Sequence, residues 1–587
     1  MKVLLTTLNS KFIHSNLAIR YLKAFCRELP VEIKIQEFTI NDNLEKVLGQ
    51  IYREEPDVLC FSCYIWNITE TLMLIDSLKK ILPSCKIVLG GPEVSFDSYK
   101  LMKEHPTIDI IVRGEGEETF LELMKSMIVG DSLDGVKGLT FRQGNDICEN
   151  EERPIIRDLD KIPFPYDMDE KGNIIGLDNK IIYYETSRGC PFNCQYCLSS
   201  VTSGVRFFSL ERVKRDLEIF RKTKVPQVKL VDRTFNCNPS RAMEIFKMIM
   251  EMKGNTNFHF EMCGDLISDE MLKLLEQASP GLFQFEIGVQ STHEGTLKAI
   301  KRKTNFRKLA KTVETLRKNR NIHLHLDLIA GLPEEDYTSF RQSFNDVYML
   351  QPDKLQLGFL KLLKGSGLRN NAGQWDYKYT TYPPYEVLKN KYISYRELLK
   401  LKGIEDLVEK YYNSHRFKHG LDYLVHYFDD NPFAFFESFN RHWEEHGYHQ
   451  VSHTLVQLYD ILLEFVEGLP NIEKDLVKDI VKFDYVSQGK PGTYPKKLLE
   501  ELPKEIREKI NLFFRDKENI ARYLPEYEGL TGKQVARAAH IEIFRYDIPS
   551  GIEKGIYQEI PTTILFDYRN PCGIFEKSRW IKINSLL

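Results

Sequence analysis

The sequence predicts a multidomain α/β protein with a mainly α-helical C-terminal part. Apolar strand patterns alternate with amphipathic helical patterns twice, first in residues 1–140 and again in residues 179–365. After residue 366 the alternation stops, and helical patterns rich in tyrosine and phenylalanine replace it. Because 587 residues exceed what one hydrophobic core accommodates, we expect three domains, with residues 141–178 as a charged, proline-bearing linker.

The first domain is predicted to be a doubly wound, Rossmann-like sheet. Its strand patterns are Val3–Leu5, Ile33–Phe38, Val58–Ser62, Ile87–Gly90 and Ile110–Val112. Leu17–Leu29 and Ile68–Leu82 have helical spacing that suits the crossovers of a parallel sheet. Ligands of such sheets bind beyond the carboxyl ends of the strands. The first strand is not followed by Gly-x-Gly-x-x-Gly, so dinucleotide binding is not supported.

The second domain is predicted to be a partial (β/α)6 barrel. Its strand patterns are Ile181–Thr186, Gln227–Val231, Phe258–Met262, Phe283–Val289, His323–Ile329 and Lys354–Phe359. Functional groups of such barrels lie at the carboxyl ends of the strands and in the loops that follow. The segment after the first strand is therefore the place to look for chemistry.

Three cysteines occupy that segment. Cys190, Cys194 and Cys197 are four and three positions apart, within Ser187-Arg-Gly-Cys-Pro-Phe-Asn-Cys-Gln-Tyr-Cys-Leu198. A structural zinc or iron-sulfur site is normally completed by a fourth protein ligand, and no further cysteine or histidine is nearby in the sequence. Three thiols can hold one iron-sulfur cluster and leave one iron open. The spacing alone also permits buried or zinc-binding thiols.

The cysteine spacing, with the aromatic residue Tyr196 before the last cysteine, resembles the motif of radical S-adenosylmethionine (SAM) enzymes. The resemblance implies a 4Fe-4S cluster on the three cysteines, whose fourth iron binds the amino and carboxylate groups of SAM. Reduction of this cluster would cleave SAM to a 5'-deoxyadenosyl radical. An electron donor such as flavodoxin or ferredoxin is implied as a partner.

Later segments add to this resemblance. In Phe285–Ser291, Glu286 and Gln290 lie on one face of a predicted strand, and Arg302 follows where relatives hold the SAM carboxylate. The resemblance implies these SAM neighbours: Tyr196, Glu261, Glu286, Gln290, Arg302, Ile329 and Leu332. The family often has Gly-Gly-Glu after the second strand, whereas this chain has Asp232-Arg-Thr. Asp232 is either a substitute contact to SAM, an ion-pair partner of Arg233, or a residue that caps a turn.

The first domain resembles the cobalamin-binding domains that precede some radical SAM domains. Small and polar residues at its strand ends are the implied cobalamin neighbours: Asn9, Ser62, Trp66, Gly90, Gly91, Glu93, Gly114, Glu115 and Gly116. The Asp-x-His-x-x-Gly motif of many such domains is missing, and His14 lacks its flanking residues. Cobalt would then have no histidine ligand from the protein. The C-terminal part resembles an uncharacterised extension of some cobalamin radical SAM proteins.

Together the resemblances imply methylation of an unactivated carbon, with SAM as the source of both methyl group and radical. Members of the family that rearrange, cyclise or oxidise their substrates leave a radical reaction without methyl transfer as an alternative. A peptide-, carrier- or RNA-binding protein or a cobalamin sensor is the alternative outside catalysis. Cys237 is a candidate hydrogen donor or substrate contact, and a buried, inert thiol is the other interpretation.

The helical C-terminal part contains two further patterns. Tyr382–Leu388, Leu398–Glu405 and Val408–Phe417 are expected to contribute to a helical bundle, and Ile564–Tyr568 has a strand pattern. His442, His446, His449 and His453 have spacing that would place them on one helical face, although Gly447 interrupts it. Solvated histidines are the favoured interpretation there, and a metal site is the other.

Cys60 and Cys63, in an apolar strand of the first domain, are expected in its core.

Composition predicts an ordinary cytoplasmic enzyme. The formal net charge of −3 and the absence of lysine- or arginine-rich blocks favour a small molecule or peptide over nucleic acid as the substrate. No apolar stretch approaches the roughly 20 residues that span a bilayer. Eleven irregularly spaced cysteines indicate a reducing compartment, and an exposed cluster would require anaerobic conditions.

Overall fold

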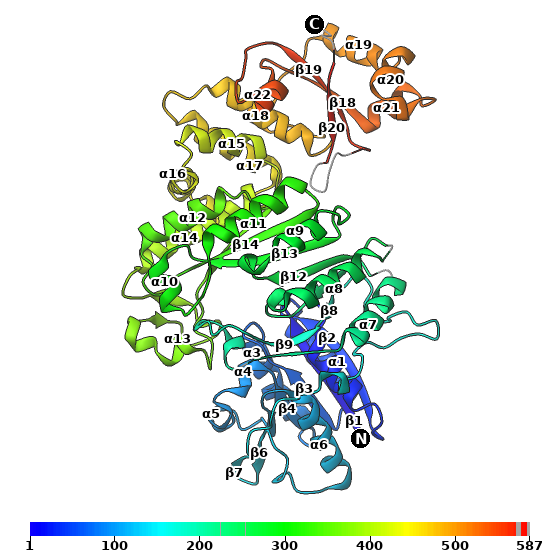
Figure 1. The fold of residues 1–587 in the computed structure, drawn as a ribbon, viewed down its shortest axis with the longest axis vertical. Coiled ribbons are helices and arrows are strands. Elements are labelled where there is room, and N and C mark those ends of the chain that lie inside the picture. Colours follow the sequence, from blue (N-terminus) through cyan, green and yellow to red (C-terminus); the bar gives the residue numbers. More distant parts are fainter. Residues whose placement is uncertain (203, 224, 253, 571–576, 584–587) are drawn as a thin grey trace. The chain divides into compact units, whose positions relative to one another are not determined.

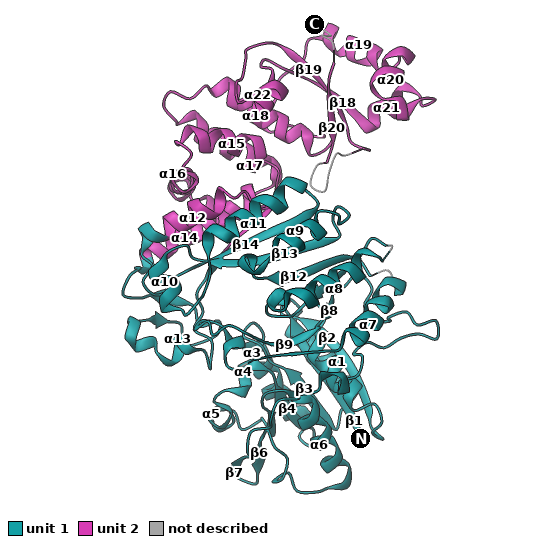
Figure 2. Cartoon of the chain, viewed as in Figure 1, with its two compact units in different colours: residues 1–339, 358–395 teal, residues 340–357, 396–587 magenta. Residues whose placement is uncertain are grey.

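The computed structural model describes residues 1–202, 204–223, 225–252, 254–570 and 577–583 (Figure 1). The chain divides into two compact units, residues 1–339 with 358–395 and residues 340–357 with 396–587 (Figure 2). The division crosses the segment predicted as the barrel, since α12 (Tyr337–Tyr348) and β15 (Lys354–Phe359) each have residues in both units. The limits of the four segments drawn from the sequence therefore remain predictions.

The first sheet has seven strands in the order β2-β1-β3-β4-β5-β6-β7. Their bounds are β1 Lys2–Asn9, β2 Glu32–Thr39, β3 Val58–Ser62, β4 Lys86–Gly90, β5 Ile110–Val112, β6 Leu139–Gln143 and β7 Asp146–Glu149. The five predicted strands, β1 to β5, are confirmed and pair in parallel. The antiparallel hairpin β6–β7 was not predicted, because its charged outer strand has no apolar alternation.

Helices cover both faces of this sheet. They are α1 Leu17–Phe25, α2 Leu44–Glu54, α3 Ile68–Ile81, α4 Pro92–Ser95, α5 Ser98–Glu104 and α6 Gly116–Val129. One core contains Ile19 of α1 and Phe120 of α6, and the other contains Ile51 of α2 and Ile75 of α3. Alternate strand residues point to opposite faces, so Cys60 lies in the first core and Cys63 in the second, as expected for buried thiols.

The second sheet confirms the six predicted barrel strands. Its order is β15-β14-β13-β12-β11-β8. The bounds are β8 Ile182–Tyr184, β11 Gln227–Leu230, β12 Asn257–Met262, β13 Phe283–Gln290, β14 Ile322–Ala330 and β15 Lys354–Phe359. The connecting helices include α7 Leu210–Thr223, α8 Pro239–Met250, α9 Asp269–Leu275, α10 Glu294–Ala299 and α11 Phe306–Asn319. A short hairpin, β9 Ser187–Cys190 with β10 Gly204–Phe207, carries the first cysteine.

The rest of the chain is mainly helical. Its helices are α14 Tyr395–Leu407, α15 Lys418–Tyr427, α16 Pro432–Glu445, α17 Leu455–Glu467, α18 Lys474–Ser487, α19 Lys504–Phe513, α20 Lys517–Tyr523, α21 Gly532–Ala538 and α22 Ile548–Lys554. A π-helical turn, Val408–Tyr412, continues α14. Three strands form an antiparallel sheet in the order β18 Ala539–Phe544, β19 Thr562–Asp567 and β20 Arg579–Ile583. β19 confirms the strand pattern predicted at Ile564–Tyr568.

Two helical predictions in this part are wrong. Tyr382–Leu388 is not a helix, because Pro383-Pro384 favours extended backbone, and β17 (Val387–Lys389) pairs there with β16 (Lys378–Tyr379). The four histidines do not share one helical face, because α16 ends at Glu445 and Gly447 adopts the left-handed conformation at φ 69°.

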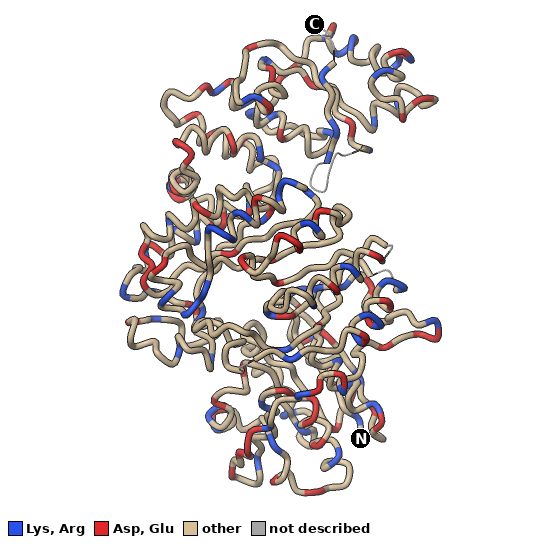
Figure 3. The backbone as a smooth tube through the Cα atoms, in the orientation of Figure 1, with Lys and Arg blue, Asp and Glu red and all other residues tan. Residues whose placement is uncertain are grey.

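Acidic and basic residues are interspersed along the chain (Figure 3). None of the helices in the described part of the chain has the length and apolar composition needed to cross a bilayer.

Candidate active site

The cysteine segment is anchored on both sides by backbone hydrogen bonds. Cys190 ends β9, Cys194 is buried, and Cys197 precedes the short 3-10 helix Leu198–Ser200. Between them, the Gln195 amide donates to the Ile300 carbonyl at 3.0 Å, and the Gln195 carbonyl accepts from the Leu368 amide at 2.8 Å. The loop that carries the thiols is therefore fixed to the segments that follow β13 and β15.

The three thiols suit a polynuclear cluster better than a single metal ion. A tetrahedral zinc ion with Zn–S bonds of about 2.3 Å requires sulfur atoms about 3.8 Å apart. Within the described residues, the triads of potential ligand atoms that lie within 4.8 Å of one another do not include Cys190, Cys194 and Cys197. The Cys197 thiol also accepts the Ser199 amide at 3.4 Å, a bond of the kind that tunes iron-sulfur clusters.

Three of the predicted SAM neighbours gather beside the buried cysteine. Arg302 donates to the Tyr196 hydroxyl at 3.0 Å and lies 3.9 Å from the Cys194 thiol. Burial alone would lower the pKa of Arg302, but the adjacent Tyr196 and Cys194 raise it, so the guanidinium stays charged. Gln290 ends β13 with φ 73°, and a Cβ on Gly288 would lie 2.2 Å from its Nε2.

Gly288 is thus a site residue that the sequence alone did not identify. Its carbonyl accepts a second hydrogen bond from Arg302, and its missing side chain leaves space for the Gln290 amide. The glycine within Glu286-Ile-Gly-Val-Gln290 was the available signal.

A polar cluster lines the inner face of the second sheet next to Glu286. Lys229 Nζ and His259 Nε2 each lie 3.1 Å from a Glu286 oxygen, and His325 Nε2 lies 3.0 Å from Asp327. Burial would raise the pKa of Glu286, but the contact from His259 and the charge of Lys229 outweigh it and lower the pKa. The sequence did not identify these partners, although alternating polar residues in β12 and β14 indicated a polar face.

Glu261 and Asp327 hold their protons more tightly than ordinary carboxyl groups. Burial raises the pKa of Glu261 to about 7, with Arg233 opposing and Glu286 adding to the shift. Burial also raises the pKa of Asp327 despite its contact with His325. Of these two residues, only Glu261 was predicted from the sequence as a SAM neighbour.

In the segment that contains the predicted SAM neighbours Ile329 and Leu332, backbone carbonyls already accept hydrogen bonds from other parts of the protein. The Gly331 carbonyl accepts from Tyr377 and from Asn390, both at 3.0 Å, and the Leu332 carbonyl accepts from Asn390 at 3.3 Å. Leu332 is fully buried, whereas Ile329, on β14, is partly accessible. Of these two predicted neighbours, Ile329 is the better placed to meet a ligand.

Asp232 serves the local structure. It is buried, and it accepts hydrogen bonds from the Thr186 amide at 2.9 Å and the Thr186 hydroxyl at 2.6 Å, and from Ser187. These bonds join the end of β11 to the strand end that leads into the cysteines. Burial raises the pKa of the nearby Cys237 thiol, and the charges of Asp232 and Cys190 raise it further, which disfavours a thiolate.

The carboxyl end of the first sheet contains a buried amide network. Asn67 donates to Thr7, to the Leu8 carbonyl and to the Ser62 carbonyl at 3.0–3.2 Å. Ser62 is buried in this network, and Asn9 donates to Glu37 and to the His14 carbonyl. Trp66, by contrast, is 42 % exposed and stacks on Tyr64 at 4.4 Å. This aromatic pair beside the strand ends, with Trp66 exposed and Tyr64 partly buried, suits a flat, partly apolar ligand.

The predicted glycines and carboxylates at these strand ends have different environments. Gly90 ends β4, and a Cβ on Gly91, which has φ 109°, would lie 2.5 Å from the Cys63 carbonyl oxygen. Gly114 is open, since a Cβ there would meet nothing within 4 Å, and Gly116 begins α6.

The carboxylates of Glu93 and Glu115 both contact other residues of the protein. Glu93 is buried, accepts from the Tyr385 hydroxyl and pairs with Lys364 at 2.9 Å. Glu115 pairs with Arg206 and accepts the Ile156 amide at 2.9 Å. Burial would raise the pKa of Glu115, and the hydrogen bonds from Arg206 and Ile156 lower it. Glu93 thus connects the end of the first sheet to the segment after β15, and Glu115 connects it to the β9–β10 hairpin.

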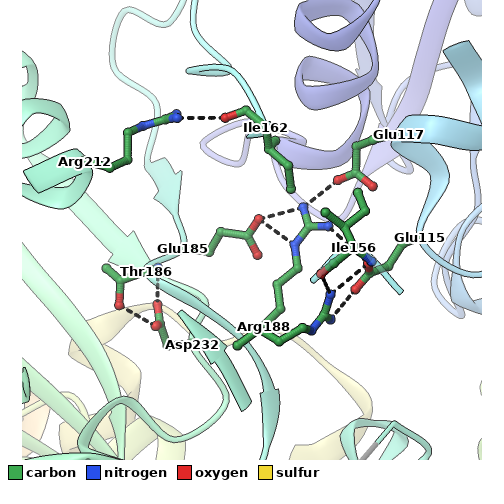
Figure 4. A network of polar contacts seen from close by, with 10 residues as sticks. Glu115, Glu117, Ile156, Ile162, Glu185, Thr186, Arg188, Arg212 and Asp232 are labelled. Atoms are coloured by element: carbon green, nitrogen blue, oxygen red, sulfur yellow. Dashed lines mark hydrogen bonds and ion pairs between the residues drawn. The ribbon is translucent and has the colours of Figure 1, made fainter. Parts of the chain in front are cut away.

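Arg188 makes the central connection between the first sheet and the cysteine segment (Figure 4). It lies two residues before Cys190 and donates to Glu185 at 2.8 Å and 2.9 Å and to Glu117 at the start of α6. All three side chains are at most 13 % exposed. His14 makes a parallel contact, because its Nδ1 lies 2.6 Å from the Tyr183 hydroxyl. The sequence did not predict either contact.

Comparison with known protein families assigns the three parts of the chain separately. Residues 3–124 match the B12 binding domain, residues 184–347 match the radical SAM superfamily, and residues 373–566 match a family described as a protein of unknown function (DUF4080).

Curated relatives and a solved structure are similar to large parts of this chain. An uncharacterized methyltransferase, PH0819 of Pyrococcus horikoshii, is 27 % identical over 66 % of this chain and 85 % of its own length. The cobalamin-dependent radical SAM methyltransferase TokK of Streptomyces tokunonensis is 28 % identical, over 50 % of this chain and 45 % of its own length. The cobalamin-dependent SAM radical enzyme OxsB is similar in fold, with a TM-score of 0.58, 14 % identity, and coverage of 83 % of this chain and 78 % of that one.

Proposed function

We propose that this chain, a radical SAM enzyme with a cobalamin-binding domain, transfers a methyl group from SAM to an unactivated carbon of a small molecule or peptide. The observation that carries the proposal is the placement of the cysteine segment and the strand ends of the first sheet in one compact unit, joined through Arg188 and Glu117. Methyltransferases among the relatives support the reaction class.

Cys190, Cys194 and Cys197 would hold a 4Fe-4S cluster, which on one-electron reduction would supply the cleavage of SAM, and the strand ends of the first sheet would hold cobalamin as the methyl carrier. The donor set fits such a cluster, and the stacked Tyr64–Trp66 pair and the open Gly114 fit a large planar ligand.

The protein's own contribution is orientation. Arg302 is placed beside Cys194 with its charge retained, so its planar guanidinium can bind the SAM carboxylate through two hydrogen bonds. Gln290, held above Gly288, is the proposed second polar contact. The other predicted contacts, Tyr196, Glu261, Glu286 and Ile329, belong to the same proposal.

The polar cluster around Glu286 is the proposed floor of the substrate site. Glu286 carries a negative charge paired with Lys229, while burial raises the pKa of Glu261 to about 7 and also raises the pKa of Asp327. This combination of acceptors and donors suits a polar substrate better than a hydrocarbon.

The test is an anaerobic reconstitution with iron, sulfide and hydroxocobalamin, followed by reduction and addition of SAM carrying a labelled methyl group. Methyl transfer predicts that label passes into the desalted cobalamin fraction even without substrate. An enzyme that forms 5'-deoxyadenosine yet leaves cobalamin unlabelled would instead favour a rearrangement, cyclisation or redox reaction.

We propose flavodoxin or ferredoxin as the electron donor, and the cytoplasm as the compartment. Radical SAM enzymes require a reductant, and cysteines throughout the described residues are free thiols. Reduction of the protein by flavodoxin in place of dithionite tests the first part.

A further inference from the structure

The four histidines between residues 442 and 453 have unequal surroundings in the structure. His449 contacts Asp406 through Nδ1 and Asn440 through Nε2, each at 2.9 Å, and His453 Nε2 lies 2.8 Å from the Tyr448 carbonyl oxygen. These two side chains are used in local packing. His442 and His446 instead have their imidazole centres 4.2 Å apart, beside a carboxylate from α17.

That carboxylate is Glu464. One nitrogen of His442, one nitrogen of His446 and one oxygen of Glu464 lie within 4.8 Å of one another. His446 Nε2 and Glu464 Oε1 are 3.6 Å apart, close to the roughly 3.3 Å that separates ligand atoms around a tetrahedral zinc ion. Two imidazoles and one carboxylate form a common zinc ligand set that leaves a fourth position open.

The hydrogen bonds behind these side chains point their ligand atoms inward. His446 Nδ1 lies 2.8 Å from the His442 carbonyl oxygen, which can only accept, so Nδ1 carries the proton and Nε2 keeps its lone pair. The Tyr448 hydroxyl donates to Glu464 Oε2 at 2.9 Å and leaves Oε1 toward the histidine. Backbone carbonyls behind histidine ligands, and hydrogen bonds to carboxylate ligands, are the usual outer partners at metal sites.

His442 adds an independent observation. Its Nε2 is buried and has no hydrogen-bond partner in the structure, which is costly for a polar atom. A metal ion would satisfy this atom.

The other candidate triad in the described residues is a poorer cation site. Glu286, His325 and Asp327 also bring three ligand atoms within 4.8 Å. However, Lys229 lies 3.1 Å from Glu286 and already provides the positive charge there.

We propose that His442, His446 and Glu464 bind one divalent transition-metal ion, with zinc as the natural ion, and thereby connect the C-terminal end of α16 to α17. The fourth position is open to water or an external ligand, since His446 and Glu464 are 42 % and 35 % exposed. The site is independent of the cofactors of the radical reaction.

The test uses the full chain, anaerobically reconstituted so that the cluster cysteines are occupied, and Co²⁺ as a spectroscopic probe. The proposal predicts one equivalent of Co²⁺ with the absorption of a four-coordinate nitrogen and oxygen site, displaced by Zn²⁺. His446→Ala and the isosteric Glu464→Gln should each weaken binding by at least about 100-fold, and Tyr448→Phe by about 10- to 100-fold.

His426→Ala is the matched control. His426 also faces a carboxylate four residues away, Asp430 at 3.2 Å, but belongs to no triad of ligand atoms in the described part of the chain. Its removal should leave Co²⁺ affinity unchanged. Parent-like affinity and stoichiometry in both His446→Ala and Glu464→Gln would overturn the proposal, as would a parent protein that binds no Co²⁺ beyond its cluster.

Discussion

Replacement of Arg188 by methionine tests how the first sheet and the cysteine segment are joined. Arg188 is 13 % exposed, and its partners Glu117 and Glu185 are 7 % and 10 % exposed. Methionine keeps much of the length but removes the charge, so two buried carboxylates lose their common partner. Breaking a buried ion pair from one side costs about 3–5 kcal/mol. We expect that loss in the local stability of residues 182–190.

Arg153→Met is the matched control. Arg153 is 12 % exposed, almost the same as Arg188, but its partners Glu118 and Glu122 are 40 % and 46 % exposed. Solvent screens these carboxylates, so the expected loss is about 0–1 kcal/mol.

Hydrogen exchange measured by mass spectrometry is the appropriate assay, because it reports local opening in a multidomain chain. Arg188→Met should speed exchange in residues 182–190 by more than about 100-fold, as a loss of 3–5 kcal/mol implies. Burial already raises the pKa of Glu185, and the loss of Arg188 raises it further. The folded variant then binds a proton that the unfolded chain has released, so the defect should grow as pH rises from 5 to 8.

Adding Glu117→Gln and Glu185→Gln to Arg188→Met should restore part of the protection, because neutral amides carry no unpaired charge. Equal effects of Arg188→Met and Arg153→Met, or a defect independent of pH and of these glutamines, would show that the buried ion pair does not hold this segment in place.

Three further predictions concern single residues. Burial raises the pKa of Asp484 from 3.8 to about 8, so the folded chain holds a proton that the unfolded chain loses. The free energy of unfolding should therefore fall by at most about 1.4 kcal/mol per pH unit between about pH 4 and 8. Asp484→Asn should remove this pH dependence in thermal melts. Gly91→Ala should lower the free energy of unfolding in urea by about 3 kcal/mol, because φ is 109° there and the new Cβ would lie 2.5 Å from a backbone oxygen. Gly114→Ala, where a Cβ meets no atom within 4 Å, should lower it by about 1 kcal/mol. Arg302→Ala should weaken SAM binding about 10- to 150-fold by calorimetry, since a charge-assisted hydrogen bond contributes about 1.5–3 kcal/mol.

Each has a clear contrary result. An unchanged pH slope in Asp484→Asn would contradict the burial of a protonated carboxyl group. Similar losses in Gly91→Ala and Gly114→Ala would contradict the tight approach to Cys63. SAM affinity equal to that of the parent in Arg302→Ala would remove Arg302 from the proposed site.

The strands were predictable because their signals are local. Apolar runs such as Val58–Ser62 match the observed bounds, since a strand buried on both faces shows an unbroken apolar pattern. The cysteine spacing was equally local. Predictions from local patterns failed where glycine or proline redirects the backbone, as at Gly447 after α16 and at Pro383-Pro384 before β17.

Partnerships between distant segments could not be predicted from local patterns. Tyr385 reaches Glu93 across 292 positions, and Arg188 reaches Glu117 across 71. Glu93 was therefore predicted as a cofactor neighbour, although in the structure its carboxylate contacts Tyr385 and Lys364. The polar cluster around Glu286 arises in the same way, because its members come from four neighbouring strands, β11 to β14.

We propose that Cys190, Cys194 and Cys197 hold the cluster that cleaves SAM. The most direct measurement is 5'-deoxyadenosine released on reduction with SAM, compared between the anaerobically reconstituted parent and Cys194→Ala with equal cobalamin content. We expect the parent to release 5'-deoxyadenosine and Cys194→Ala to lose both the cluster and the product. Equal iron content and equal 5'-deoxyadenosine from the two proteins would contradict it.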